Sequence, residues 1–261
     1  MADADELLRA GDLDGARASL VESVRKTPQD QPARMFLFQL LCVSGEWDKA
    51  LIQLRALAQL SPEAQMLAAA YSQAIEAEKF RAQVFAGGAQ PALLVKSPWA
   101  GDLAGALSAL CQGRTEDAQA LRDQAFDAAP DTPGDLDGAP FDWIADGDSR
   151  FGPAIEAIIA GQWGLVPFDT IEKIESEGPR DLRDIVWLPV QLAFKTGQSV
   201  AALLPARYPG SEARPDAAIR LGRGTDWLVQ PWGQAGVGQH EWSLSDGTDV
   251  GILSLRRLTF H

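Results

Sequence analysis

The first half of the chain repeats itself every 34 residues, and this period constrains the fold more than any other feature of the sequence. Gly11 and Gly45 stand 34 positions apart, and two further periods lead to Gly113. The same offset aligns Leu7 with Leu41, Asp14 with Asp48, Ala16 with Ala50, Leu20 with Leu54 and Pro28 with Pro62, and the last repeat keeps Ala118 and Pro130. A period of this length indicates a stack of similar units in which each contacts its neighbours.

Each repeated residue type has a physical role in a helical hairpin. Glycine after a helix takes the left-handed conformation that reverses the chain, a small alanine lets two helices approach closely, and proline cannot continue a helix. This pattern is typical of tetratricopeptide repeats, so we predict helix for most of residues 3–128. The unit before the last has Lys79 at the glycine position and Lys96 at the proline position. There we expect either a turn near residues 78–80 with other chemistry or an irregular helix pairing.

The second half of the chain has a different composition and no 34-residue period. Proline and glycine are frequent between residues 130 and 140, and six of the eight tryptophans follow, among short strand-like segments. We predict an α+β protein in two parts: tetratricopeptide-like helical repeats over 1–130, a linker over 131–139, and a Trp-rich domain with a small mixed sheet or barrel over 140–261. Within the latter we predict helices at 151–161 and 171–177, and strands at 185–187, 191–194, 199–205, 227–230, 239–244 and 250–257.

Charge narrows the choice of partner. The chain has 23 basic and 36 acidic residues, a net charge of −13, and both halves are acidic. Nucleic acids and anionic membranes attract basic proteins, so we expect neither as a partner. The start of the chain lacks the features of a signal peptide, and no apolar run approaches the 18 or so residues of a membrane span. We therefore expect a soluble cytoplasmic protein.

Acidic residues near the start of the second part form the one cluster with possible chemistry. Asp142, Asp146 and Asp148 could together hold a hard cation, but an EF-hand would need a glutamate where Pro153 stands. We favour a turn and helix entry, with Arg150 as ion-pair partner, over a polar cluster facing a partner, and place a metal or catalytic site last.

Catalytic motifs are missing from the sequence. His240 and His261 are the only histidines, and we interpret His240 as structural. The glycines at 222–224 and 233–238 fit tight turns between strands better than a phosphate loop. Arg183 stands between Asp181 and Asp184, and we interpret it as part of a buried ion-pair network rather than as a residue that binds a substrate. Cys42 and Cys111 belong to no motif. We expect no enzyme activity, no metal and no cofactor.

A set of ordered motifs in the second part resembles one protein family. The motifs are Pro-Phe-Asp-Trp-Ile-Ala-Asp-Gly-Asp-Ser-Arg-Phe-Gly-Pro at 140–153, Glu-Ala-Ile at 156–158, Trp163, Val-Pro-Phe at 166–168, Asp-Leu-Arg-Asp at 181–184, Arg-Tyr-Pro-Gly-Ser-Glu at 207–212, Gly-Val-Gly-Gln at 236–239 and Leu-Arg at 255–256. They are similar to those of the ImpE/TagJ family of type VI secretion accessory proteins. One departure is His240, where family members often have arginine.

The resemblance implies a cytoplasmic, non-enzymatic protein that binds the N-terminal helix of TssB, the small subunit of the contractile sheath. It also implies a link to ClpV, the ATPase that recycles the sheath. The candidate partner-binding residues are Trp143, Asp146, Asp148, Arg150, Trp163, Arg183 and Trp187. Two alternatives remain open: a generic repeat scaffold or cochaperone, and a carboxylate-based metal enzyme built on Asp142, Asp146, Asp148 and Glu156.

Overall fold

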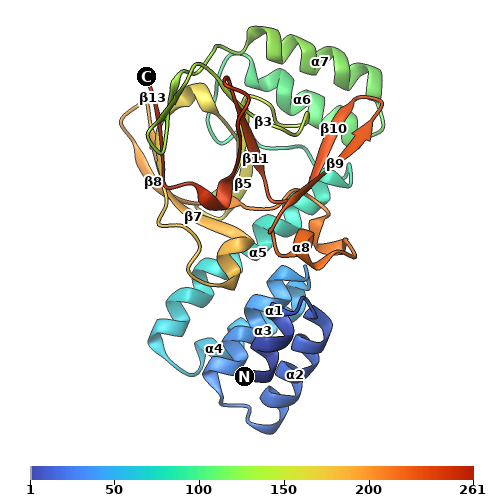
Figure 1. Ribbon diagram of the computed structural model, residues 1–261, viewed down its shortest axis with the longest axis vertical. Helices are drawn as coiled ribbons and strands as arrows, with labels where there is room; N and C mark the ends of the chain where they lie inside the picture. Colours follow the sequence, from blue (N-terminus) through green and yellow to red (C-terminus); the bar gives the residue numbers. More distant parts are fainter. Residues whose placement is uncertain (1) are drawn as a thin grey trace.

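The computed structural model describes residues 2–261, and its first half is helical (Figure 1). Seven α-helices follow one another: α1 (Ala2–Arg9), α2 (Leu13–Lys26), α3 (Gln31–Val43), α4 (Trp47–Ala58), α5 (Pro62–Phe85), α6 (Ala100–Cys111) and α7 (Thr115–Ala128). Helices α1 and α2, α3 and α4, and α6 and α7 pack as hairpins. The predicted helical repeats are therefore confirmed. Within the described residues, no helix is both long and apolar enough to cross a membrane.

The repeated glycines and alanines have the predicted roles. Gly11, Gly45 and Gly113 end their helices with φ of +83°, +68° and +77°, a conformation that residues with a side chain rarely adopt. Ala16 and Ala50 are fully buried between helices. The repeated glycines therefore mark where the chain turns, and the repeated alanines mark where the helices approach most closely.

Two of these glycines allow a matched test. A methyl group at Gly45 would come within 2.7 Å of Cγ of Glu212, whereas one at Gly113 would meet no atom within 4 Å. We expect Gly113→Ala to lower the free energy of unfolding by about 1 kcal/mol, the cost of a left-handed alanine, and Gly45→Ala to lower it further. Urea denaturation of the two variants measures the difference. Equal losses would contradict a close approach at Gly45.

The degenerate repeat unit is irregular. Helix α5 continues without a break through residues 78–80, so the expected turn is wrong and the alternative of irregular pairing is correct. After α5 the chain runs along a strand of the second part: the N–H of Leu94 donates to the carbonyl of Leu165 at 3.0 Å, and that of Leu165 donates to Ala92 at 2.8 Å. In the third unit, the chain that follows α5 therefore contacts a sheet where the other units have a second helix.

The second half is a set of antiparallel sheets. The strands are β1 (Gly134–Leu136), β2 (Ala139–Phe141), β3 (Ile144–Asp146), β4 (Ala154–Ile159), β5 (Gln162–Pro167), β6 (Ile171–Glu175), β7 (Trp187–Phe194), β8 (Ser199–Pro205), β9 (Thr225–Gln230), β10 (Gly233–Gly238), β11 (Glu241–Leu244), β12 (Asp249–Gly251) and β13 (Arg257–Phe260). Eight form a curved sheet in the order β2-β1-β13-β6-β7-β8-β4-β5. Strands β12-β11-β3 and β10-β9 form two smaller sheets. Short helical segments are α8 (Ala217–Arg220), η1 (Phe168–Thr170), η2 (Leu182–Ile185), η3 (Ser211–Ala213) and η4 (Ile252–Ser254).

Both helices predicted in the second part are wrong. Residues 151–161 contain β4, which turns at Ala160 and Gly161, both with positive φ, into β5. Residues 171–177 contain β6, whose register shifts between Ile171 and Lys173. Such a bulge inserts one residue, so Ile171 and Ile174 both face the core at a spacing of three that imitates a helix.

Most predicted strands are present with shifted ends. Strand β8 matches the prediction over 199–205, and 191–194 lies within β7. The strand predicted over 185–187 is wrong, because the end of η2 and a turn precede β7 there, and the one predicted over 250–257 is divided among β12, η4 and β13. The glycines at 233–238 form β10 rather than a turn. A methyl group on Gly236 would lie 2.2 Å from the Tyr208 ring, so a close approach explains the glycine there.

The core crosses the expected boundary between the two parts. One apolar cluster joins side chains of α1 to α6 with Trp163, Trp187 and Tyr208 of the strand-rich half. A second cluster, which includes Phe168 and Trp242, fills the space between the large sheet and β3-β11-β12. Residues 134–136 of the expected linker form β1, which pairs with both β2 and β13 and therefore belongs to the large sheet.

Candidate partner-binding site

A buried ion pair connects the helical half to the sheet. The guanidinium of Arg81, on α5, donates to both carboxylate oxygens of Glu156, on β4, at 2.7 and 2.6 Å. The indole of Trp163 donates to the same carboxylate at 2.9 Å. Burial alone would raise the pKa of Glu156, but Arg81 and then His240 lower it to about 2. Glu156 is therefore ionised and fully partnered in the interior.

His240 lies between two carboxylates. Its Nδ1 is 2.7 Å from Oδ2 of Asp146, and its Nε2 is 3.0 Å from Oε2 of Glu156, an ion-pair contact without hydrogen-bond alignment. Burial alone would lower the pKa of His240, but Asp146 and then Glu156 raise it to about 9. The Tyr208 hydroxyl donates to the other oxygen of Asp146 at 2.8 Å. The imidazole is thus a buried cation at neutral pH.

Two more buried charges complete this set. Glu78, on α5, accepts from the indole of Trp187 at 3.0 Å and lies near Arg81, while Arg207 donates to the carbonyl of Val43 at 2.9 Å. We define the junction network as the three acidic and three basic residues that the helical and strand-rich halves bring together: Glu78, Arg81, Asp146, Glu156, Arg207 and His240. When all three acids are ionised, its charges balance with His240 protonated, although burial raises the pKa of Glu78 and of Asp146.

The three aspartates of residues 142–148 have different environments in the structure. Asp148 is fully buried, and its carboxylate accepts from the backbone and side chain of Arg150 and from the N–H of Gly236 at 2.7 Å. Asp146 belongs to the junction network, whereas Asp142 is exposed. The interpretation of Asp148 as a turn-forming residue with Arg150 as partner is confirmed, but the segment leads into β4 rather than into a helix.

Metal coordination by these carboxylates has no geometric support. Within residues 2–261, no group of three or more His, Cys, Asp or Glu side chains has an arrangement that could hold a metal ion. A protonated His240 has no free lone pair to offer, and the carboxylates beside it already accept hydrogen bonds. The network therefore binds the two halves of the protein to each other.

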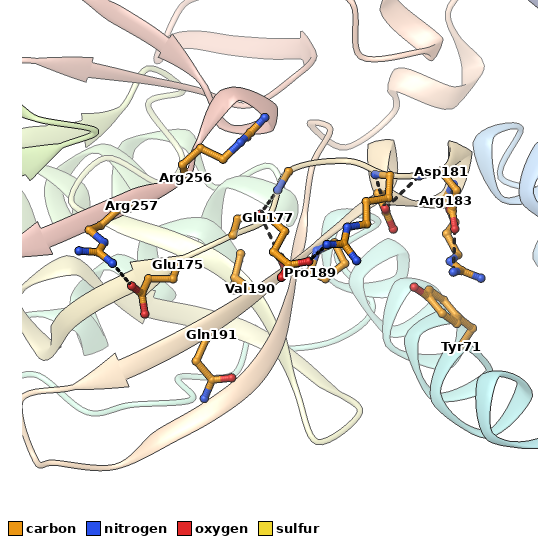
Figure 2. A pocket seen from close by; sticks show the side chains of 14 residues that line it. Tyr71, Glu175, Glu177, Asp181, Arg183, Pro189, Val190, Gln191, Arg256 and Arg257 are labelled. Atoms are coloured by element: carbon orange, nitrogen blue, oxygen red, sulfur yellow. Dashed lines mark hydrogen bonds and ion pairs between the residues drawn. The ribbon is translucent and has the colours of Figure 1, made fainter. Parts of the chain in front are cut away.

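An open cleft of about 740 Å³ lies where α5 meets the ends of β6 and β7 (Figure 2). Arg183 of η2 forms an ion pair with Asp181 at 2.7 Å, and its guanidinium lies 4.7 Å from the centre of the Tyr71 ring. Burial raises the pKa of Tyr71 to about 12, so the ring stays neutral beneath this cation. The cleft carries four arginines and four carboxylates: Arg180, Arg183, Arg256, Arg257, Glu175, Glu177, Asp181 and Asp184.

A second, apolar hollow of about 300 Å³ continues from this ionic cleft. The two share Tyr71, Pro189 and Val190. Its wall is α5, with Ala70, Gln73 and Ala74, and its floor is the outer face of the sheet, with Ala201 to Leu203 on β8 and the β4-β5 turn. We refer to the ionic cleft and the apolar hollow together as the α5 groove.

Comparison with known proteins decides the family. A family model described as ImpE protein matches residues 138–259, and one described as tetratricopeptide repeat matches residues 7–74. A protein of Pseudomonas aeruginosa named "Type VI secretion system accessory component TagJ" is 44% identical over 258 residues, which cover 98% of this chain and 90% of that protein. The chain belongs to the ImpE/TagJ family. The resemblance stated from the motifs is confirmed.

The ImpE/TagJ fold is also seen in a crystal structure. Protein VPA1032 from Vibrio parahaemolyticus has 25% sequence identity with this chain and a TM-score of 0.87. The match covers 99% of this chain and 97% of that one. The helical half and the sheets therefore have the same relative placement in both proteins.

The seven residues predicted to bind a partner have very different environments in this ImpE/TagJ protein. Trp163, Trp187, Asp146 and Asp148 are buried, and Arg150 is 12% exposed. Trp143 is 42% exposed, and Arg183 lines the α5 groove. Their role in partner binding stays a prediction, and of the seven only Trp143 is exposed, because the side chain of Arg183 is 19% exposed. The sequence did not single out Arg81 or Tyr71. Both lie on a helix among other polar residues, and nothing in the neighbouring sequence distinguishes them.

Proposed function

We propose that this chain is a non-enzymatic accessory protein of a type VI secretion system. In this proposal it acts in the cytoplasm, binds the N-terminal helix of the sheath subunit TssB, and links the sheath to the ATPase ClpV. The observation that carries the proposal is the 44% identity to the TagJ protein of Pseudomonas aeruginosa across 98% of the chain.

The physical character of the protein agrees with an adaptor role. Helical repeats present extended surfaces to helices and peptides, and an amphipathic helix binds by inserting an apolar stripe into a groove. The buried histidine and carboxylates are occupied with one another, so they are poorly suited to acid–base chemistry on a substrate. The charge of −13 favours a neutral or basic partner surface.

Calorimetric titration tests the proposal directly. We expect a synthetic peptide of the N-terminal helix of the cognate TssB to bind the full chain saturably, with a dissociation constant in the micromolar range, roughly −8 kcal/mol. A peptide of the same composition but scrambled order, which has no apolar stripe, is the matched control. Absence of heat and of any saturable signal at high micromolar concentration would rule out the TssB interaction.

The link to ClpV has its own test. If the chain connects sheath to ATPase, a preformed complex of the chain with TssB retains ClpV in a pull-down, and ClpV is lost when the chain is omitted. Equal retention of ClpV with and without the chain would remove the bridging part of the proposal and leave the TssB interaction standing.

A further inference from the structure

Strand β9 has one free edge. It pairs only with β10, in an uninterrupted register, and the two strands form a hairpin at the side of the strand-rich half (Figure 1). The outer edge of β10 is already occupied: the N–H of Ser149 donates to the carbonyl of Gln234 at 3.0 Å, and the N–H of Gly236 donates to the carboxylate of Asp148 at 2.7 Å. An added strand can therefore reach this hairpin only at β9.

The free edge presents backbone groups of Trp227 and Val229. Because Gln234 and Gly236 direct theirs away from β9, the hydrogen-bonded pairs of the hairpin are the ones between them, such as Leu228 with Ala235. Backbone direction alternates along a strand, so the N–H and C=O groups of Trp227 and Val229 point outward. Among residues 2–261 no hydrogen bond from elsewhere in the chain reaches them. Unpaired groups of this kind are a template for another strand.

The other sheet edges of the described residues are short or covered. Residues 92–94 cover β5, and β2, β3 and β12 have three residues each. Strand β9 is longer and has no lysine, proline or bulge, which are the features that commonly protect a sheet edge. Its Val229 is 88% exposed, the largest fraction for a large apolar side chain in this part of the chain. These features indicate an edge that is covered in the assembled protein.

The sequence of β9 complements itself across a two-fold axis. When two β9 strands run antiparallel with Leu228 opposite Leu228 of the second copy, Trp227 stands opposite Val229 and Asp226 opposite Gln230, each twice. Pairs of an aromatic with a β-branched residue stabilise a sheet, and the carboxylate of Asp226 can accept a hydrogen bond from the amide of Gln230. The pairs of Trp227 with Val229 are the ones that exchange backbone hydrogen bonds. An axis through Trp227 would instead place Asp226 opposite Leu228, so the first register is favoured.

Charge permits a second copy to approach at β9. The net charge of −13 makes most of the surface repel another copy, but between residues 224 and 239 the only charged residue is Asp226. In the register above, the two Asp226 carboxylates are separated by about 13 Å along the strands, because four residues lie between their positions. Closed two-fold dimers are also the commonest form of oligomer.

We propose that the chain forms a two-fold dimer in which β9 of one copy pairs antiparallel with β9 of a second copy. The two β9-β10 hairpins then form one continuous sheet across the axis, and Val229 is covered by Trp227 of the second copy. Such a dimer has two helical halves, and so two copies of any partner site that those halves carry. The proposal is independent of the proposed function, because it concerns a different surface and a different partner.

The first experiment exchanges charges on the axis. In sedimentation equilibrium of the full chain, we expect the mass of the wild type to approach twice 28.0 kDa at high micromolar concentration. Leu228→Glu and Leu228→Lys each place two like charges opposite one another, so each weakens the dimer about ten-fold or more. An equimolar mixture of the two variants recovers the dimer to within about three-fold of the wild type, because the opposed charges now attract. A misfolded variant could not be rescued in this way.

Matched controls place the same charges at another exposed apolar side chain. Met66, on α5, is 78% exposed, and we expect Met66→Glu and Met66→Lys to leave the dimer unchanged. A wild type that stays monomeric over the whole concentration range would overturn the proposal. So would a mixture of Leu228→Glu and Leu228→Lys that is no more dimeric than its components, or a dimer that Met66→Glu dissociates and Leu228→Glu does not.

A cysteine on the axis gives a second readout. Residues of a non-hydrogen-bonded antiparallel pair have Cα atoms about 4.5 Å apart, which a disulfide can span. We therefore expect Leu228→Cys to form a covalent dimer on mild oxidation, seen on a non-reducing gel. Gln230→Cys is the matched control, because its two copies lie about 13 Å apart along the strands and stay unlinked, as does the wild type with Cys42 and Cys111. Equal cross-linking of Leu228→Cys and Gln230→Cys would contradict the register and with it the proposal.

Discussion

Replacing Glu156 by glutamine lowers the free energy of unfolding by about 3 kcal/mol, the largest effect that we expect from a single substitution. The wild-type carboxylate accepts two hydrogen bonds from Arg81 and one from Trp163, and lies in ion-pair contact with His240. The amide has nearly the same shape but no charge, so two buried cations lose their shared counter-ion. Removing one partner of a buried pair typically costs about 3–5 kcal/mol.

Glu172→Gln is the control for this change. Glu172 lies on β6 of the same sheet, and its side chain is exposed. We expect it to change stability by less than about 0.5 kcal/mol, as surface substitutions usually do. Guanidinium denaturation followed by tryptophan fluorescence measures both variants. If the two substitutions have similar effects, the junction network does not hold the helical half against the sheet.

The helical half could be predicted because its signals are local. Each hairpin has a glycine at its turn and an alanine at its closest approach, and both recur at a fixed interval. The third unit departs from the period because the chain after α5 pairs with β5, and this pairing has no counterpart in the repeat.

 Strand β5 begins at Gln162, which is 77 residues beyond Phe85 at the end of α5. Contacts over such distances in the chain leave no periodic trace.

The strand-rich half shows where local reasoning fails. Residues 154–158 are buried on both faces of β4, so this segment lacks the alternation that marks a half-exposed strand. In β6 the bulge gives Ile171 and Ile174 a helical spacing. The strand β8 was predictable because its flanks contain clear turn residues, with Gly197 before it and Pro205 at its end.

The candidate site was the least predictable part. His240 looked like an isolated structural histidine, yet it contacts Asp146, 94 positions away in the chain. Arg81 and Glu156 are 75 positions apart, and neither stands in a motif with the other. The acidic spacing of Asp146 and Asp148 suggested a shared role, but the two side chains bind different partners. Only the folded chain brings these charges together.

Raising the pH from 6.5 to 9 is expected to destabilise the protein through His240. Its pKa is raised from 6.5 to about 9 in the folded chain, so folding favours the protonated form. This stabilisation is fully present below pH 6.5, where both states carry the proton, and is lost as the pH rises through 9. The loss amounts to about 3 kcal/mol. Denaturant unfolding at a series of pH values measures it.

Three variants separate this effect from other titrations. His240→Gln removes the cation, so stability is lower at pH 6.5 and nearly independent of pH up to 9. His240→Arg keeps a cation beside Asp146 and Glu156 at every pH in this range, so the slope disappears while the charge balance of the junction network is preserved. His261→Gln, which changes the exposed residue at the end of the chain, keeps the wild-type slope. A wild-type slope in His240→Gln would assign the pH dependence to another group and leave His240 uncharged in the folded protein.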